Sequence, residues 1–188
     1  MRLTAIAAFA ALTVSAWAVP PVPRKAPEFT IVLPDGKQQL LSSYKGKVIA
    51  FAFMATWCPH CQEYSKMLTR LHRELGPRGF QPLGVAFNSG VTPAMVNEFI
   101  GKFGVDFPVG VSAVDPVLSY LGISAIERYG YPQVVLIDRK GMIRAQSPVP
   151  GVDAALANEV SLRSLIEGLL AEGATTTTSS AKKPASSK

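Results

Sequence analysis

The chain has two cysteines, Cys58 and Cys61, and they come shortly after an apolar run at residues 48–54. A short, continuous apolar run is typical of a strand that is buried on both faces of a sheet. Two residues separate the cysteines, so one helical turn places both sulfur atoms within bonding range. The sequence therefore predicts a fold built around one central strand, with a thiol pair where that strand ends.

A helix is predicted to begin at the cysteine pair. Pro59 suits a first helical turn, and Gly76 with Pro77 stops the helix. The apolar residues with helical spacing are Tyr64, Met67, Leu68, Leu71 and Leu75. Such a helix places Cys58 at its N-terminus, where free backbone N–H groups and the helix dipole stabilise a thiolate.

The two thiols are expected to have different roles. Thiol–disulfide exchange needs one thiolate to attack and a second thiol to resolve the mixed disulfide. Cys58 is the expected nucleophile, and Cys61, one turn further in and more buried, is the expected resolving thiol of a redox-active disulfide. His60 is expected to place a positive charge or an N–H near the Cys58 sulfur. A more stable thiolate makes the disulfide more oxidising.

Three other uses of the cysteines are less well supported. A zinc site needs four ligands, and the other candidate ligand is His72, which is expected to lie on the solvated side of its helix. Attachment of c-type haem needs a histidine directly after the second cysteine, and that residue is Gln62. An inert structural disulfide would close a very small loop and add little stability. We therefore expect no metal and no diffusible cofactor.

Strands and helices alternate through the chain, which predicts an α/β fold with a mixed central sheet flanked by helices. The expected strands are residues 29–33, 48–54, 80–87, 107–111, 134–137 and 142–146, the last two joined by a hairpin turn. Further helices are expected at residues 93–103, 115–121 and 161–171. Thr92 and Asp115 are the expected caps of the first two. The residues expected to face the core in the last helix are Leu162, Leu165, Ile166, Leu169 and Leu170.

Residues 1–18 have the pattern of a secretory signal peptide. A positive start and an apolar stretch lead to the small-x-small tripeptide Ala16-Trp17-Ala18. An uncleaved membrane anchor is the alternative, since residues 3–19 reach the short limit for a membrane-spanning helix. A cleaved leader predicts a periplasmic or other extracytoplasmic protein with no stable membrane insertion, in a compartment where disulfides form and persist.

The remaining chain is expected to contain one folded domain. Residues 19–27 carry four prolines and are expected to form an extended spacer. Residues 28–172 are the expected domain, and residues 173–188 an expected disordered Ser/Thr/Lys tail. Four of the nineteen Lys and Arg residues lie outside residues 19–173, which leaves fifteen basic against thirteen acidic residues. Such a balance argues against nucleic acid as a partner.

The motif Trp57-Cys58-Pro59-His60-Cys61, placed after an apolar strand, resembles that of the thioredoxin superfamily. Pro132 lies just before a predicted strand and hairpin, as a cis-proline does in that family. Over residues 26–172 the chain is similar to exported thioredoxins of the TlpA/ResA type and to the related redoxin domains. The resemblance implies a thioredoxin-like fold in which Pro132 lies beside the two sulfur atoms.

The resemblance also implies a groove for a client protein. In the family, the residue before the cis-proline offers its backbone to an extended client segment, in the manner of an added strand; here that residue is Tyr131. Trp57 is expected to shield the active face or to belong to the core. Tyr129 and Tyr131 are expected to contact clients or to pack against the hairpin. The candidate catalytic residues are Cys58, Cys61, Pro59, His60, Trp57 and Pro132, and those for client binding are Tyr131, Pro132 and Trp57.

Two positions depart from the family pattern. Thioredoxins often carry a buried acid six residues before the first cysteine, where this chain has Ala52. ResA-like proteins carry an acid three residues after the second cysteine, where this chain has Tyr64; the adjacent Glu63 is expected to point elsewhere on the helix. The dipeptide Pro59-His60 also occurs in the oxidant DsbA, whereas the flanking segments resemble reductive TlpA-type proteins. The direction of electron flow therefore stays open.

These observations predict an exported thiol–disulfide oxidoreductase. Its partners would be protein thiols or disulfides and a membrane or exported thiol-redox protein. A peroxiredoxin-like thiol peroxidase is one alternative, although Thr56 is not preceded by the proline of the Pro-x-x-x-Thr-x-x pattern. A thioredoxin-fold copper-binding or adaptor module is the other. Copper(I) suits two cysteine ligands, but no Met or His is evident to complete such a site.

Overall fold

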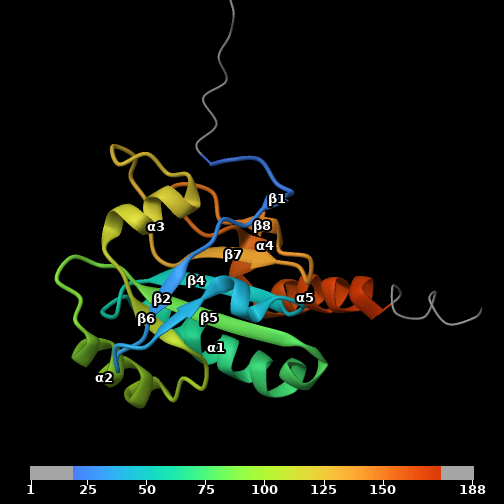
Figure 1. The fold of residues 1–188 in the computed structure, drawn as a ribbon, viewed down its shortest axis with the longest axis horizontal. Coiled ribbons are helices and arrows are strands. Elements are labelled where there is room, and N and C mark those ends of the chain that lie inside the picture. The colour runs from blue at the N-terminus through green and yellow to red at the C-terminus, as the bar shows by residue number, and fades with distance from the viewer. Residues whose placement is uncertain (1–18, 175–188) are drawn as a thin grey trace, which may run out of the picture.

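The computed structural model describes residues 19–174. An eight-stranded mixed sheet, in the order β1-β8-β7-β4-β5-β6-β2-β3, is covered by helices on both faces (Figure 1). The strands are β1 (Arg24–Lys25), β2 (Thr30–Val32), β3 (Gln38–Leu40), β4 (Val48–Met54), β5 (Phe80–Ala86), β6 (Val109–Val111), β7 (Gln133–Ile137) and β8 (Met142–Gln146). The α-helices are α1 (Pro59–Leu75), α2 (Pro93–Phe103), α3 (Val114–Leu121), α4 (Ala154–Ala157) and α5 (Glu159–Ala174). The predicted α/β class is confirmed.

The central strand is β4, as the apolar run predicts. It pairs in parallel with β5 and antiparallel with β7, and all seven of its residues are buried. Alternate side chains of a strand point to opposite faces. Ala52 and Met54 belong to the core that contains residues of α1, α2 and α5, whereas Phe51 and Phe53 belong to the core that contains residues of α3. Burial on both faces accounts for the continuous apolar sequence.

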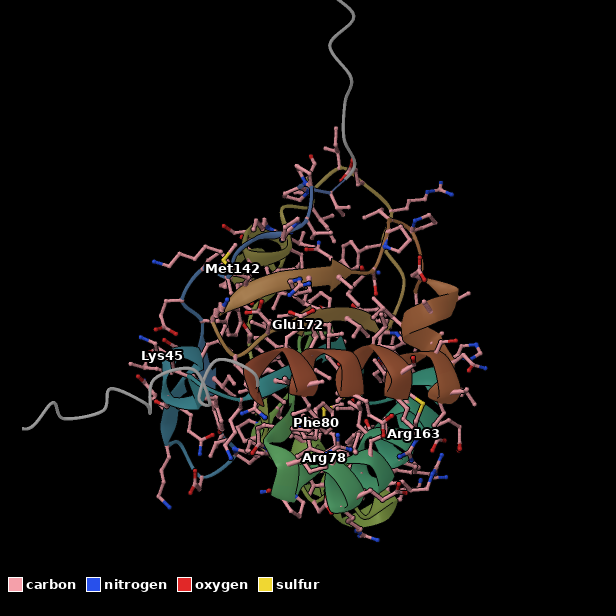
Figure 2. The ribbon with its side chains drawn as sticks, turned by 90° about the vertical axis from the view of Figure 1, so that its right-hand side faces the viewer. Lys45, Arg78, Phe80, Met142, Arg163 and Glu172 are labelled. Carbon is pink, nitrogen blue, oxygen red and sulfur yellow. The ribbon has the colours of Figure 1, made fainter. Side chains whose placement is uncertain are left out.

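Helix α5 lies across one face of the sheet (Figure 2). It is longer than predicted and continues past residue 173, the predicted start of the tail, while the sequence pattern does not indicate α4 at all. Four of the five residues expected to face the core are buried, but Leu165 is 38% exposed. That expectation is wrong because Leu165 lies at the edge of the apolar stripe that the other four form.

Four ion pairs in the described part of the chain attach α5 to its neighbours, and two of them show the pattern. Arg163 of α5 lies 2.7 Å from Glu74 of α1. Glu172, near the C-terminal end of α5, lies 2.7 Å from Arg144 of β8. Arg163 and Glu172 are labelled at separate positions along α5 in Figure 2. The helix is therefore tied both to α1, which carries the cysteines, and to the sheet.

One predicted helix cap is confirmed and the other is wrong. Thr92 caps α2, and its Oγ1 accepts a hydrogen bond from the Met95 N–H at 3.3 Å. Helix α3 begins at Val114, with Ala113 as its N-cap residue and no side-chain cap. Asp115 therefore lies in the first turn of α3, where its charge favours the helix through the dipole rather than through a capping hydrogen bond.

Two residues of the segment 19–27, which the sequence predicts to be an extended spacer, form the edge strand β1. Strand β1 pairs antiparallel with β8, and the Arg24 guanidinium donates hydrogen bonds to the Gln146 side chain and to the Pro20 carbonyl. The predicted signal peptide and the predicted tail beyond residue 174 lie outside the described residues. Within residues 19–174, no helix combines the length and the hydropathy needed to cross a membrane.

Candidate active site

Cys58 and Cys61 lie where β4 ends and α1 begins. Cys58 is the N-cap residue of α1, and its sulfur accepts a hydrogen bond from the backbone N–H of Cys61 at 3.4 Å. Pro59 occupies the first helical position, where a missing N–H costs no helical hydrogen bond. Both thiols are free. The positive end of the helix dipole therefore lies at the Cys58 sulfur, as the spacing predicts.

The two thiols differ in their surroundings. Cys58 is 5% exposed and Cys61 is 1% exposed. Burial raises the pKa of the Cys61 thiol, and its hydrogen bond with Cys58 raises that pKa further. The inner thiol therefore tends to keep its proton, and Cys58 is the less buried of the two thiols.

The loop at residues 129–132, here called the proline loop, lies beside Cys58. The Tyr131–Pro132 peptide bond is cis, as the resemblance implies, and Pro132 is buried. The Cys58 thiol donates a hydrogen bond to the Tyr131 carbonyl oxygen, with an S···O distance of 3.8 Å. Strands β4 and β7 bring these segments together, with Phe53 opposite Gln133. The backbone of Tyr131 thus lies next to the reactive sulfur.

Aromatic rings border the site. Trp57 is 63% exposed, so the alternative that it belongs to the core is wrong. Its ring meets Tyr131 edge-on, with the centroids 5.8 Å apart. Tyr131 also contacts Phe87, on which Tyr129 stacks. Burial raises the pKa of Tyr131 to about 12, so its hydroxyl stays neutral at physiological pH. Both tyrosines therefore take part in packing near the hairpin.

A cavity of about 490 Å³ lies beside Pro132. Its lining includes His60, Tyr64 and Met67 of α1, Tyr131 and Pro132 of the proline loop, and Val152. The first turns of α1 and the proline loop both contribute to the cysteine site. The cavity therefore adjoins the place where a client attached to Cys58 would lie.

His60 is the second residue of α1. Its side chain is exposed and lines this cavity. In the described part of the chain, the hydrogen bonds of the Cys58 sulfur involve Cys61 and Tyr131, and none involves His60. The expectation that His60 places a positive charge near this sulfur stays a prediction.

Neither acidic position of the related proteins holds an acid here. Ala52 is fully buried on β4. Tyr64 is buried one turn after Cys61, and burial raises its pKa; its hydroxyl has no hydrogen-bond partner within residues 19–174. Glu63 is exposed and pairs with Lys66 at 2.8 Å, consistent with its expected direction on the helix. These positions therefore offer no carboxylate to the Cys61 thiol.

The sequence interpretation missed two residues that brace the loop before Cys58. Asn88 accepts a hydrogen bond from the Thr56 N–H at 3.2 Å, and Gln62 donates one to the Thr56 carbonyl at 3.3 Å. Asn88 follows shortly after the buried strand β5, and a polar residue at that point is the one sequence signal that could have indicated it. These two contacts hold the Thr56 peptide groups in place ahead of the cysteines.

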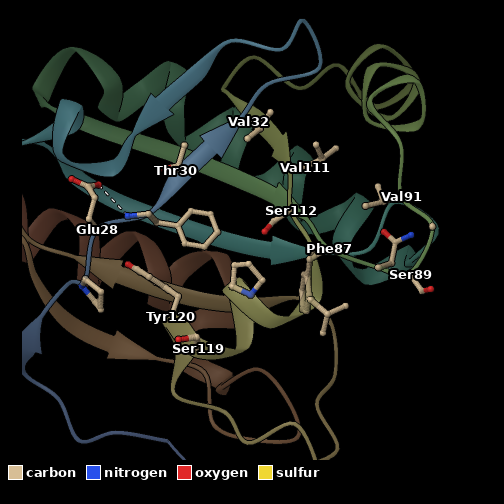
Figure 3. A pocket seen from close by; sticks show the side chains of 17 residues that line it. Glu28, Thr30, Val32, Phe87, Ser89, Val91, Val111, Ser112, Ser119 and Tyr120 are labelled. Atoms are coloured by element: carbon tan, nitrogen blue, oxygen red, sulfur yellow. Dashed lines mark hydrogen bonds between the residues drawn. The ribbon is translucent and has the colours of Figure 1, made fainter.

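A larger cavity, of about 1020 Å³, lies among β2, β6, α3 and the loop after β5 (Figure 3). Its lining includes Phe29, Phe87 and Tyr120. Neither cysteine contributes to it. Asn88 also lines it and connects it to the cysteine loop through Thr56. The cysteine pair, and not this larger cavity, therefore defines the candidate site.

His72 lies elsewhere, near the C-terminal end of α1. Its Nδ1 is 3.1 Å from Oδ1 of Asp106, and its side chain is 24% exposed. The residue is therefore paired and partly buried rather than freely solvated, because α1 packs close to the segment that follows α2. Among residues 19–174, no group of three or more His, Cys, Asp or Glu side chains is arranged to hold a metal ion.

The Redoxin family model matches residues 21–160. The thiol-disulfide oxidoreductase ResA of Geobacillus thermodenitrificans is 29% identical over 119 residues, which are 63% of this chain and 64% of the relative. ResA of Bacillus subtilis is 29% identical over 118 residues, which are 63% of this chain and 62% of the relative. The matched region thus spans less than two thirds of the length of these relatives.

Solved structures share the fold. A thiol:disulfide interchange protein of the thioredoxin family from Chlorobium tepidum has a TM-score of 0.65 at 24% identity, over 80% of this chain and 99% of that one. A thiol:disulfide interchange protein from Bacteroides sp. has a TM-score of 0.64 at 19% identity, over 80% and 91% of the two chains. These likenesses confirm the predicted thioredoxin-like fold. With three quarters of its length matched by the family model, the chain belongs to the Redoxin family.

Proposed function

We propose that the chain is a thiol–disulfide oxidoreductase that acts on protein cysteines. The observation that carries the proposal is the position of the Cys58 sulfur, which meets the Cys61 N–H on one side and the Tyr131 carbonyl on the other. A nucleophile, a resolving thiol and a backbone segment that a client can pair with therefore lie in one place. The relatives named as thiol-disulfide oxidoreductases support the same chemistry.

The geometry accommodates both steps of the exchange. In the reductive direction, the Cys58 thiolate attacks one sulfur of a client disulfide, and the other client sulfur leaves as a thiolate that takes up a proton. Cys61 then loses its proton and attacks the Cys58 sulfur, which forms the Cys58–Cys61 disulfide and releases the second client thiol. Two electrons pass from the cysteine pair to the client. The same steps in reverse oxidise client thiols.

The other site residues act by position. Pro132 has no N–H, so it does not compete for the sulfur atoms beside it. Tyr131 offers its backbone to an extended client segment, as in strand addition. Trp57 adds an exposed apolar ring next to Cys58. His60 lines the cavity beside Pro132, where its side chain can meet a client.

Insulin reduction in the presence of dithiothreitol tests the proposal. Cys58→Ser is expected to abolish the catalysed rate. Pre-reduced Cys61→Ser, mixed with insulin after dithiothreitol has been removed, is expected to accumulate a mixed disulfide between Cys58 and insulin, because the resolving thiol is lost. Mass spectrometry under non-reducing conditions detects that species. Full activity in the Cys58 variant would sink the proposal. Hydrogen peroxide consumption and copper(I) titration, measured on the same proteins, test the peroxidase and the copper-binding alternatives.

We also propose export, with a membrane or exported thiol-redox protein as the electron partner. The pattern of residues 1–18 supports this, and residues 28–172 together with the edge strand β1 are the proposed folded domain. N-terminal sequencing of the protein from a periplasmic fraction tests cleavage of the leader. The reduction potential of the cysteine pair decides the direction. A value of about −270 mV, as in thioredoxin, indicates a reductant, and a value of about −120 mV, as in DsbA, indicates an oxidant.

A further inference from the structure

Gln133, the residue after Pro132, joins the proline loop to a second loop. It is fully buried at the start of β7. Its side-chain nitrogen Nε2 donates a hydrogen bond to the Gly130 carbonyl at 3.0 Å and a longer one to the Gly151 carbonyl at 3.5 Å. Its oxygen Oε1 is buried and has no hydrogen-bond partner within residues 19–174. The side chain is therefore held through its two donor contacts alone.

The second loop, residues 148–152, is here called the support segment. The Gly130 N–H donates a hydrogen bond to the Pro150 carbonyl of this segment. A Cβ atom at Gly130 would lie 2.6 Å from the same oxygen, so the two backbones approach as closely as a glycine allows. Val152 of the support segment lines the cavity beside Pro132. The support segment thus both holds the proline loop and borders the cavity beside Pro132.

The contact between Gln133 and Gly130 bears directly on Tyr131. The Gly130 carbonyl and the Tyr131 N–H belong to one planar peptide unit, in which the two groups point in opposite directions. A hydrogen bond that fixes the carbonyl therefore also fixes the direction of the Tyr131 N–H. The carbonyl of Tyr131 is placed separately, next to the Cys58 thiol. A client strand that pairs with Tyr131 needs both the N–H and the carbonyl of Tyr131 to point toward it.

We propose that Gln133 is a positioning residue for client binding, which it serves by setting the direction of the Tyr131 N–H beside Cys58. The inference rests on the proposed function. In this role Gln133 does not contact the sulfur atoms. Its loss is therefore expected to weaken the binding of an extended protein client, while the reaction of Cys58 with a small reagent stays the same.

The variant Gln133→Met tests this role. Methionine has a similar length and removes both donor contacts of the Gln133 side chain. No other side-chain hydrogen bond is lost, because Oε1 makes none within residues 19–174. We expect the KM for insulin to rise about tenfold, with kcat and the rate of Cys58 alkylation by iodoacetamide both within about twofold of the original chain. Gln133→Asn, which keeps the amide but shortens its reach, is a milder second variant if the first fails to fold.

Ser147→Ala is the matched control. Ser147 is fully buried, and its Oγ accepts a hydrogen bond from the Val134 N–H at 2.9 Å, one residue further along β7 than Gln133. It makes no contact with the Tyr131 peptide unit in the described structure. We expect this variant to lose stability while its KM for insulin stays unchanged.

Different results would overturn different parts of the proposal. An unchanged KM in Gln133→Met, or an equal rise in Ser147→Ala, would show that Gln133 has only a structural role. A parallel fall in Cys58 alkylation would show that it acts on the sulfur instead of on the client. Absence of insulin reduction by the original chain would refute the proposed function itself, and that measurement comes first.

Discussion

Replacing Gly130 by alanine tests how closely the proline loop must approach the support segment. The added Cβ would lie 2.6 Å from the Pro150 carbonyl oxygen, closer than Cβ atoms come to any neighbour in real proteins. The obstacle is backbone, so no change of side-chain rotamer relieves it. The φ angle of Gly130 is outside the left-handed region, so alanine meets no conformational barrier of its own. The clash must therefore separate the two loops.

The loss in the free energy of unfolding follows from the contacts that break when the two loops separate. The hydrogen bond from the Gly130 N–H to Pro150 is lost, and the contact of Gln133 with Gly151 lengthens. One hydrogen bond contributes about 1 kcal/mol, and overpacking adds about 1–2 kcal/mol. We expect the free energy of unfolding to fall by about 2–3 kcal/mol. In a domain of this size that lowers Tm by roughly 4–12 °C.

Thermal unfolding and insulin kinetics measure the two consequences. Gly151→Ala is the control, because a Cβ at that neighbouring glycine would meet nothing within 4 Å. Gly130→Ala is expected to lower Tm and to raise the KM for insulin, whereas Gly151→Ala is expected to leave both nearly unchanged. Equal Tm values for the two variants would refute the steric argument. A lower Tm with an unchanged KM would show that the loop position does not govern client binding.

Two further predictions concern Cys61 and Trp57. Burial raises the pKa of Cys61, so the folded thiol keeps its proton above about pH 8.5, where the unfolded thiol loses it. The free energy of unfolding of the reduced chain should therefore fall as pH rises above that value. Urea unfolding should show a smaller fall for Cys61→Ala, which lacks this thiol. Identical pH profiles for the original chain and the variant would contradict the reasoning. Trp57→Ala should change the free energy of unfolding by less than about 0.5 kcal/mol, because Trp57 is 63% exposed, yet raise the KM for insulin. Val160→Ala, at an exposed residue of α5, is its control, and equal KM values for the two variants would count against a client-binding role for Trp57.

Local sequence signals were sufficient for the centre of the molecule. The apolar run, the cysteine spacing and Pro59 all act within a few residues, and they correctly place β4, the start of α1 and the order of Cys58 and Cys61 along the helix. The resemblance adds Pro132, whose cis peptide bond the structure shows beside Cys58. These signals are reliable because helix geometry and strand burial depend on the nearest neighbours in the chain.

One wrong expectation concerns side-chain direction. Leu165 is expected in the core and is exposed. Composition and spacing place a residue on an element, but what that element packs against decides which way a side chain at its edge points. Asp115 is a different case, because α3 begins two residues earlier than the Asp-Pro pattern indicates.

The sequence by itself determined where the thiol pair lies, since two residues between the cysteines are enough to place both sulfur atoms on one helical turn. Only the tertiary structure decided what surrounds them. The pairing of β4 with β7 brings Tyr131 to Cys58 across 73 residues, and contacts between loops join Gln133 to Gly130 and Gly151. No spacing along the chain encodes these contacts, because they depend on the order of strands in the sheet and on how closely two loops pack.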